Sequence, residues 1–160
     1  MKKIPTDLLK YELRKLQLKV AEESRSSFIT FVKKVWPEFI AGEHHKIIAK
    51  KFEDISRGKI KRLIVNMPPR HTKSEFASHL FPAWMMGRNP KLKIIQTTHT
   101  AELSYNFGRK VRGLFDQDGF KDVFPSVTLS QDSKAAGRFN TNKGGEYFAA
   151  GVGGAITGRG

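Results

Sequence analysis

One short segment combines the side chains that a phosphate-binding site needs, Met67-Pro68-Pro69-Arg70-His71-Thr72-Lys73-Ser74. The segment has the register of the phosphate-binding loop G-x-x-x-x-G-K-S, with Met67 and Thr72 at the two glycine positions. In such a loop the Lys73 ammonium group contacts the β- and γ-phosphates, and the Ser74 hydroxyl completes the Mg²⁺ shell. The pattern therefore predicts a site for ATP and Mg²⁺ that lacks the usual glycines.

A loop of this kind lies between a strand and a helix. Residues 63–65 are a short continuous apolar run, which predicts a strand buried on both faces. Residues 74–86 predict a helix that Pro82 kinks or shortens. The backbone N–H groups at the start of that helix would face an anion, which the helix dipole favours.

Thr72 is the unfavourable residue of the loop. Its β-carbon crowds a backbone that normally approaches phosphate closely, and the preceding Pro68 and Pro69 could pre-set the turn. A second interpretation therefore stays open, in which the segment is only a basic strand-to-helix turn capped by Thr72.

Further elements continue the alternation of strand and helix. Residues 92–97 predict a second buried strand, and residues 101–115 a helix with its apolar residues in phase. This order is typical of a parallel sheet with right-handed crossovers. Shorter elements follow at residues 120–124, 127–129, 137–141 and 146–150, the last two forming a hairpin around Asn142-Lys143-Gly144-Gly145.

Three helices are predicted ahead of the loop, at residues 7–23, 28–35 and 43–57. In the first, apolar residues recur at steps of four, three and four: Leu9, Leu13, Leu16 and Val20. This row could dock a partner subunit or pack against its own domain. We therefore expect an N-terminal helical segment over residues 1–58 and a partial P-loop ATPase core over residues 59–160. The expected fold class is α/β, an incomplete P-loop NTPase-like parallel sheet with flanking helices.

The composition restricts the function further. The chain has 160 residues, no cysteine, and 29 Lys and Arg against 15 Asp and Glu, which gives a net charge of +14. Thiolate metal sites and Cys nucleophiles are excluded, and the charge favours a polyanionic partner such as nucleic acid. No apolar run is long enough to span a bilayer or resembles a signal peptide, so we expect an intracellular protein without a membrane partner.

The loop and its surroundings also resemble a known family. The segments Asn66-Met67-Pro68-Pro69-Arg70-His71-Thr72-Lys73-Ser74-Glu75, Phe81-Pro82-Ala83-Trp84 and Gly87-Arg88-Asn89-Pro90 are similar to the large subunit of tailed-phage terminases, the ATP-driven motor that packages viral DNA. The similarity continues through residues 108–112 and 144–147 to the glycine-rich residues 151–160, and it covers most of residues 28–160. Threonine before the lysine is a tolerated variant in that family.

This resemblance implies roles for individual residues. Lys73 and Ser74 match the phosphate and Mg²⁺ residues, and Arg70 matches the loop arginine. Arg159 corresponds to an arginine finger that some terminases present to a neighbouring subunit, or is a surface residue of a flexible loop. The expected nucleotide contacts are Pro69, Arg70, His71, Thr72, Lys73, Ser74 and His45. His44 and His45 fall where the family contacts adenine, although a structural role for them is the favoured interpretation.

The resemblance also implies partners and a location. They are double-stranded DNA, other copies of the chain in a ring, the terminase small subunit and the portal protein. The location is the host cell cytoplasm, transiently at the procapsid portal. In full length the family joins its ATPase to a nuclease, whereas this sequence stops at Gly160, before the acidic Mg²⁺-binding strand and the catalytic Glu. We therefore expect nucleotide binding with feeble or no hydrolysis.

The family places that acidic strand between the strands predicted at residues 63–67 and 92–97. Its absence predicts unpaired strand edges, and with them low solubility or dependence on a complementing segment.

Three alternatives remain at this stage. The chain could be a non-catalytic basic module that binds DNA, a truncated gene remnant, or a helicase-like or kinase-like P-loop enzyme. Basic residues near 59–62 and 109–112 could contact DNA phosphates, although such runs are more often solvated surface. The five histidines have no acidic partner at metal-ligand spacing, so no zinc site is expected.

Overall fold

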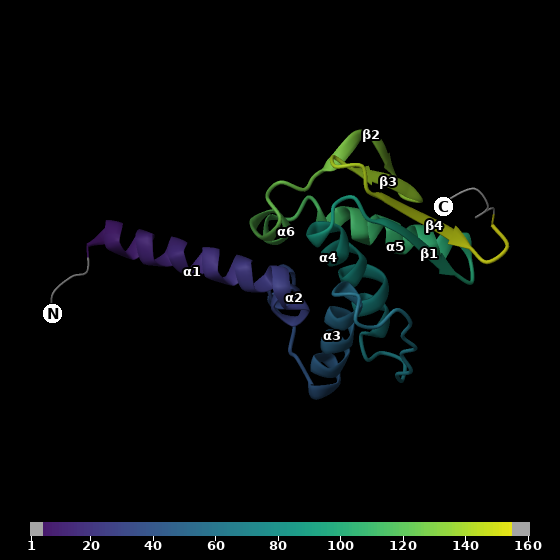
Figure 1. The fold of residues 1–160 in the computed structure, drawn as a ribbon, viewed down its shortest axis with the longest axis horizontal. Helices are drawn as coiled ribbons and strands as arrows, with labels where there is room; N and C mark the ends of the chain where they lie inside the picture. Colours follow the sequence, from purple (N-terminus) through teal and green to yellow (C-terminus); the bar gives the residue numbers. More distant parts are fainter. Residues whose placement is uncertain (1–4, 155–160) are drawn as a thin grey trace.

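The computed structural model describes residues 5–154, without the side chains of residues 132–134. Three helices come first and confirm the prediction: α1 (Thr6–Ser26), α2 (Phe28–Val35) and α3 (Glu43–Ser56). The Ser27 hydroxyl accepts the Thr30 N–H at the start of α2, and Gly58 is left-handed just beyond α3. Figure 1 shows α1 projecting away from the other elements.

Pro82 changes the helix that follows the loop. The predicted helix over residues 74–86 divides into a π-helix, η1 (Glu75–Leu80), and α4 (Phe81–Arg88). Because proline has no N–H, it cannot bond to the carbonyl four residues earlier. Just before the proline, the N–H of Phe81 bonds to Phe76 O, five residues earlier, which is the hydrogen bond of a π-helix. The predicted disturbance at Pro82 is therefore confirmed, and it takes the form of a π-helix.

The strand predicted at residues 63–65 is wrong. These residues belong to no strand; Leu63 and Val65 are half-buried against the core, whereas Ile64 is 87% exposed. A strand needs a neighbour to pair its backbone groups, and no strand in the described part of the chain pairs with this segment. The apolar run therefore buries one side and leaves the other in solvent.

The sheet is mixed, which corrects the parallel sheet predicted above. It contains β1 (Lys93–Thr98), β2 (Leu129–Ala135), β3 (Arg138–Thr141) and β4 (Glu146–Gly151) in the order β1-β4-β3-β2. Only β1 and β4 are parallel; β3 is antiparallel to both β4 and β2. The predicted hairpin joins β3 and β4, and a connection this short permits only antiparallel pairing. The α/β class is confirmed at the level of a sheet flanked by helices.

Helix α5 (Ala101–Leu114) packs on β4 and β1. Gly108 permits α5 to pack closely on the turn between β2 and β3, because a β-carbon there would lie 2.0 Å from Ala136 O. The other face of β1 is uncovered and Ile95 is 47% exposed, so the prediction of a buried strand at residues 92–97 is wrong as to burial. In the described residues β1 pairs only with β4, which leaves one edge unpaired as expected. The short element predicted at residues 120–124 is a helix, α6 (Asp118–Val123).

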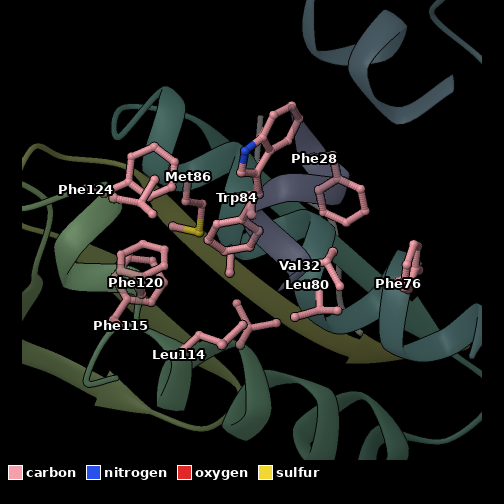
Figure 2. Packing of buried hydrophobic residues seen from close by; sticks show 14 of the residues in the cluster. Phe28, Val32, Phe76, Leu80, Trp84, Met86, Leu114, Phe115, Phe120 and Phe124 are labelled. Atoms are coloured by element: carbon pink, nitrogen blue, oxygen red, sulfur yellow. The ribbon is translucent and has the colours of Figure 1, made fainter. Parts of the chain in front are cut away.

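The core is a hydrophobic cluster rich in aromatic side chains, which also contains aliphatic residues such as Leu80, Met86 and Leu114 (Figure 2). Phe28 from α2 contacts the rings of Phe52, Phe76, Phe81 and Trp84. The buried Trp84 indole also donates to Ser24 O at 2.8 Å, which ties α4 to the end of α1. Residues from both predicted segments, 1–58 and 59–160, therefore share one core, and it holds α3 and η1 on either side of the loop.

Candidate functional site

The loop backbone takes the conformation that glycine normally supplies. Arg70 has φ +63° and Thr72 has φ +59°, and Thr72 stands at the second glycine position of the phosphate-binding register. A left-handed conformation is uncommon for any residue with a side chain and is most strained for a β-branched one. The β-carbon of Thr72 therefore does not prevent the turn, but the turn needs support from outside the loop.

His45 of α3 provides that support. The Gly42 N–H donates to His45 Nδ1 at 2.9 Å, so the ring proton sits on Nε2, which donates to Thr72 Oγ1 at 2.7 Å. The Thr72 hydroxyl in turn donates to His71 O at 2.7 Å. This hydrogen-bond chain fixes the side chain of the strained residue to the start of α3.

The environment favours the neutral form of this imidazole. His45 is only 7% exposed, and burial lowers its pKa, with further lowering from His44 and His71. Phe39 and Phe76 pack against its ring at 4.8 and 5.0 Å between centroids. Because both ring nitrogens already bond within the protein, the structure gives His45 the role of a brace for the loop.

Lys73 and Ser74 lie together where the loop enters the helix. The Lys73 ammonium group donates to Met67 O at a long 3.4 Å, reaching back across the loop to the first glycine position. Both residues border an open cavity of about 370 Å³, which is otherwise lined by Phe52, Ile55, Leu63, Val65, Ala77 and Ser78. The described residues provide no acceptor for the backbone N–H groups of Lys73 and Ser74, as is usual in a first helical turn.

The remaining predicted site residues are at the tip of the loop or beyond the described residues. Pro69, Arg70 and His71 are exposed, and His71 Nδ1 donates to Pro69 O at 2.9 Å. Arg159 lies outside the described residues. The structure therefore brings Arg70, Thr72, Lys73 and Ser74 onto one turn.

A second cluster follows the loop directly. Glu75 Oε2 accepts from His79 Nδ1 at 2.9 Å, and its other oxygen pairs with Lys110 of α5. Burial acts to raise the pKa of Glu75, but hydrogen bonds from Lys110 and His79 outweigh it and lower the pKa; burial lowers the pKa of His79. The ionised carboxylate thus links η1 to α5. The spacing of Glu75 and His79, four residues apart on one helix, could have indicated this pair from the sequence.

Neither a protein-family model, nor a curated protein, nor a solved structure matches the chain. The function therefore has to be argued from the geometry of the loop and from its motif. None of the helices in the described part of the chain is long and apolar enough to cross a membrane.

The side chains around the loop suit a phosphate better than a bare metal ion. In residues 5–154 no group of three or more His, Asp or Glu could hold a metal. No carboxylate borders the cavity beside Lys73 and Ser74. A Mg²⁺ ion bound here would take one ligand from the Ser74 hydroxyl and the others from phosphate oxygens and water, which is common for this ion. A bound nucleotide would thus bring most of the metal's ligands with it.

Proposed function

We propose that residues 67–74 bind the phosphates of ATP with Mg²⁺. The observation that carries this proposal is the left-handed backbone at Thr72, immediately before Lys73 and at the glycine position of the register. It supports a turn in which unpaired N–H groups and a lysine meet at the start of a helix, the arrangement that favours a phosphate group.

Each residue would have a distinct task in binding. The 3.4 Å contact of Lys73 with Met67 O is long for a hydrogen bond, so the ammonium group can exchange it for a phosphate oxygen at little cost. Ser74 is exposed and would supply its hydroxyl to Mg²⁺. Arg70 would add a mobile positive charge at the outer phosphates. His45 would act indirectly, by holding the turn.

Binding without efficient hydrolysis is the expected behaviour of this chain. Hydrolysis requires a group that positions or activates the attacking water. No acid lines the cavity, and the nearest one along the chain, Glu75, is already engaged by His79 and Lys110. Among the described residues, the lining of this cavity therefore supplies phosphate-binding groups but no carboxylate for the water.

On the larger scale, we propose that the chain is the ATP-binding part of a terminase-like DNA-packaging motor. The support is the similarity of residues 66–90 to that family, together with the basic net charge of +14. Double-stranded DNA, a ring of further copies, the small subunit and the portal protein would then be its partners, at the procapsid in the host cytoplasm.

Titration with a fluorescent ATP analogue and Mg²⁺ tests the site. Lys73→Ala should abolish binding, because it removes the only side-chain charge bordering the cavity. Lys91→Ala is the matched control: it removes the same charge from an exposed position before β1 and should leave the affinity unchanged. Equal affinity of Lys73→Ala and wild type would refute the site.

The net charge supports a second candidate, a basic module that binds DNA without nucleotide. Lys61 and Arg62 are exposed beside the segment that leads into the loop. Phosphate contacts make affinity fall with salt, by a slope that decreases when a contacting cation is removed. DNA binding that is weakened by Lys61→Ala and Arg62→Ala, but ignores both ATP and Lys73→Ala, would favour this candidate.

A further inference from the structure

Helix α1 exposes a row of large apolar side chains. Leu9, Leu13 and Leu16 are 57–58% exposed, although they recur at the spacing of a buried helix face. Only the last turns of α1 pack against the body, where Ala21 and Ser24 are buried, and Figure 1 shows the rest of the helix standing clear. Exposed leucines in such a regular row indicate an interaction surface.

The row has the spacing of a coiled-coil seam. Leu9, Leu13, Leu16 and Val20 follow one another at steps of four, three and four, which are the d, a, d and a positions of consecutive heptads. We call these four residues the leucine row. Another side of α1 faces α6. Between the two helices lies a hollow, which is lined by Arg14, Gln17, Leu18 and Ala21 of α1 and by Lys121, Asp122 and Pro125. The three leucines of the row are therefore free while α1 stays attached to the body, and Val20, at the attached end, is half-buried.

We infer that the leucine row pairs with the same row of a second copy, in an antiparallel two-stranded coiled coil. In this orientation an a residue packs against a d residue of the other helix. Leu13 then faces Leu16 of the second copy, and Leu9 faces Val20, so that all four residues are covered in four symmetric layers. The pairing is isologous and closes at two copies. It depends on neither ATP nor the proposed loop site.

The charges beside the row favour this orientation. Glu12 and Lys19 occupy g positions, are exposed, and have no ion-pair partner in the part of the chain that the structure describes. In an antiparallel pair g positions meet g positions, which places Glu12 of each copy beside Lys19 of the other. The e positions pair Lys10 with Gln17, so no like charges meet.

A parallel pair fits less well. It would align Glu23 with Glu23 at the next d position and would give Glu12 only Gln17 as a neighbour. It would also bring both bodies to the same end of the pair, because each body is attached at the C-terminal turns of α1. The antiparallel arrangement places the bodies at opposite ends of a helix roughly 31 Å long.

Sedimentation equilibrium of the whole chain, from micromolar to millimolar concentration, tests the association. The wild type should show a monomer–dimer equilibrium, and Leu13→Asp should weaken it at least about tenfold, because a charge would replace a buried leucine. Leu8→Asp is the matched control. Leu8 is 51% exposed on the same helix but off the row, so this variant should dimerise like the wild type.

Charge reversal and cross-linking test the orientation. Glu12→Lys and Lys19→Glu should each weaken the dimer, and the double variant should restore it. Because the chain contains no cysteine, single cysteines can be introduced cleanly. A mixture of Leu13→Cys and Leu16→Cys chains should form disulfides faster than either variant alone.

Three results would overturn the proposal. One is a wild type that remains monomeric over the whole concentration range. This holds whether hydrogen exchange then finds the backbone of the leucine row unprotected or finds it protected by another segment of the same chain. Another is a dimer that Leu13→Asp and Leu8→Asp affect equally. The third is faster self-linking of Leu13→Cys than of the mixed pair, which would indicate parallel helices.

Discussion

The brace between His45 and Thr72 can be tested by a double-mutant cycle. His45→Phe keeps an aromatic ring among Phe39 and Phe76 but removes the hydrogen bonds to Gly42 and Thr72. At about 0.5–1.5 kcal/mol for each hydrogen bond, this variant should lose about 1–3 kcal/mol of unfolding free energy. The loss should appear as a lower midpoint in urea denaturation without a change of slope.

Thr72→Gly should by itself change stability little. Glycine relieves the left-handed strain of Thr72, worth about 1–2 kcal/mol. Against this stand the lost hydrogen bond from the buried His45, about 1 kcal/mol, and the greater freedom of glycine in the unfolded chain, about 0.5–1 kcal/mol. The second lost bond, from the Thr72 hydroxyl to His71 O, is exposed, so water replaces it at little cost. These effects nearly cancel, so we expect a net change within about 1 kcal/mol.

The two changes together decide the point. In the Thr72→Gly background His45 no longer has a hydroxyl to hold, so His45→Phe should cost about 1 kcal/mol less than in the wild type. Urea denaturation of all four proteins at pH 7.5 measures this coupling free energy. A coupling below about 0.3 kcal/mol, the scatter expected of independent sites, would refute the brace. The variant Thr72→Ser, which keeps the hydroxyl, should retain the coupling.

Three further predictions concern the surroundings of the loop. Folding lowers the pKa values of His45 and His79 from 6.5, so near and below this pH the unfolded chain binds more protons than the folded one. The free energy of unfolding should therefore be constant above pH 7 and fall as the solution is acidified. Equal urea midpoints at pH 7.5 and pH 5.5 would contradict this. Phe28→Ala should lose about 3–5 kcal/mol of unfolding free energy, because it leaves a cavity among five aromatic rings. Thermal denaturation followed by circular dichroism measures this loss, and a value below about 1 kcal/mol would be the contrary result. Glu75→Gln should lower the unfolding free energy by about 1 kcal/mol, because it weakens the ion pair with Lys110. In a Lys110→Met background the same change should have no such effect, and an equal loss in both backgrounds would contradict the link.

Local patterns predicted the helices well and the strand pairing poorly. The apolar spacing of α1, α2, α3 and α5 and the glycines after β3 are signals contained within a few residues, and the structure confirms them. Residues 63–65 show the limit of such signals. A short apolar run is compatible with a strand, but only a neighbouring strand can pair its backbone, and the run itself carries no information on that neighbour.

The candidate site was predicted in the same partial way. The register of residues 67–74 located the loop, and Thr72 was identified as its unfavourable residue. The hydrogen bond that holds Thr72 was not predicted, because His45 lies 27 residues earlier and no local pattern joins the two. The pair Glu75 and His79 was detectable in principle, from side chains four residues apart on one helix.

The geometry of the loop also explains why a brace is present at all. Residues 61–66, which lead into the loop, belong to no strand, and β1 pairs only with β4 in the described part of the chain. The loop is therefore held by α3 through His45 and by η1, which begins immediately after Ser74. Where no strand fixes the entering chain, a left-handed threonine can relax into a less strained conformation. The buried imidazole of His45 on α3 opposes that relaxation. Its Nε2–H group bonds to the Thr72 oxygen, and no other acceptor for it is present among the described residues. Because His45 is only 7% exposed, losing this bond would leave a buried donor unpaired.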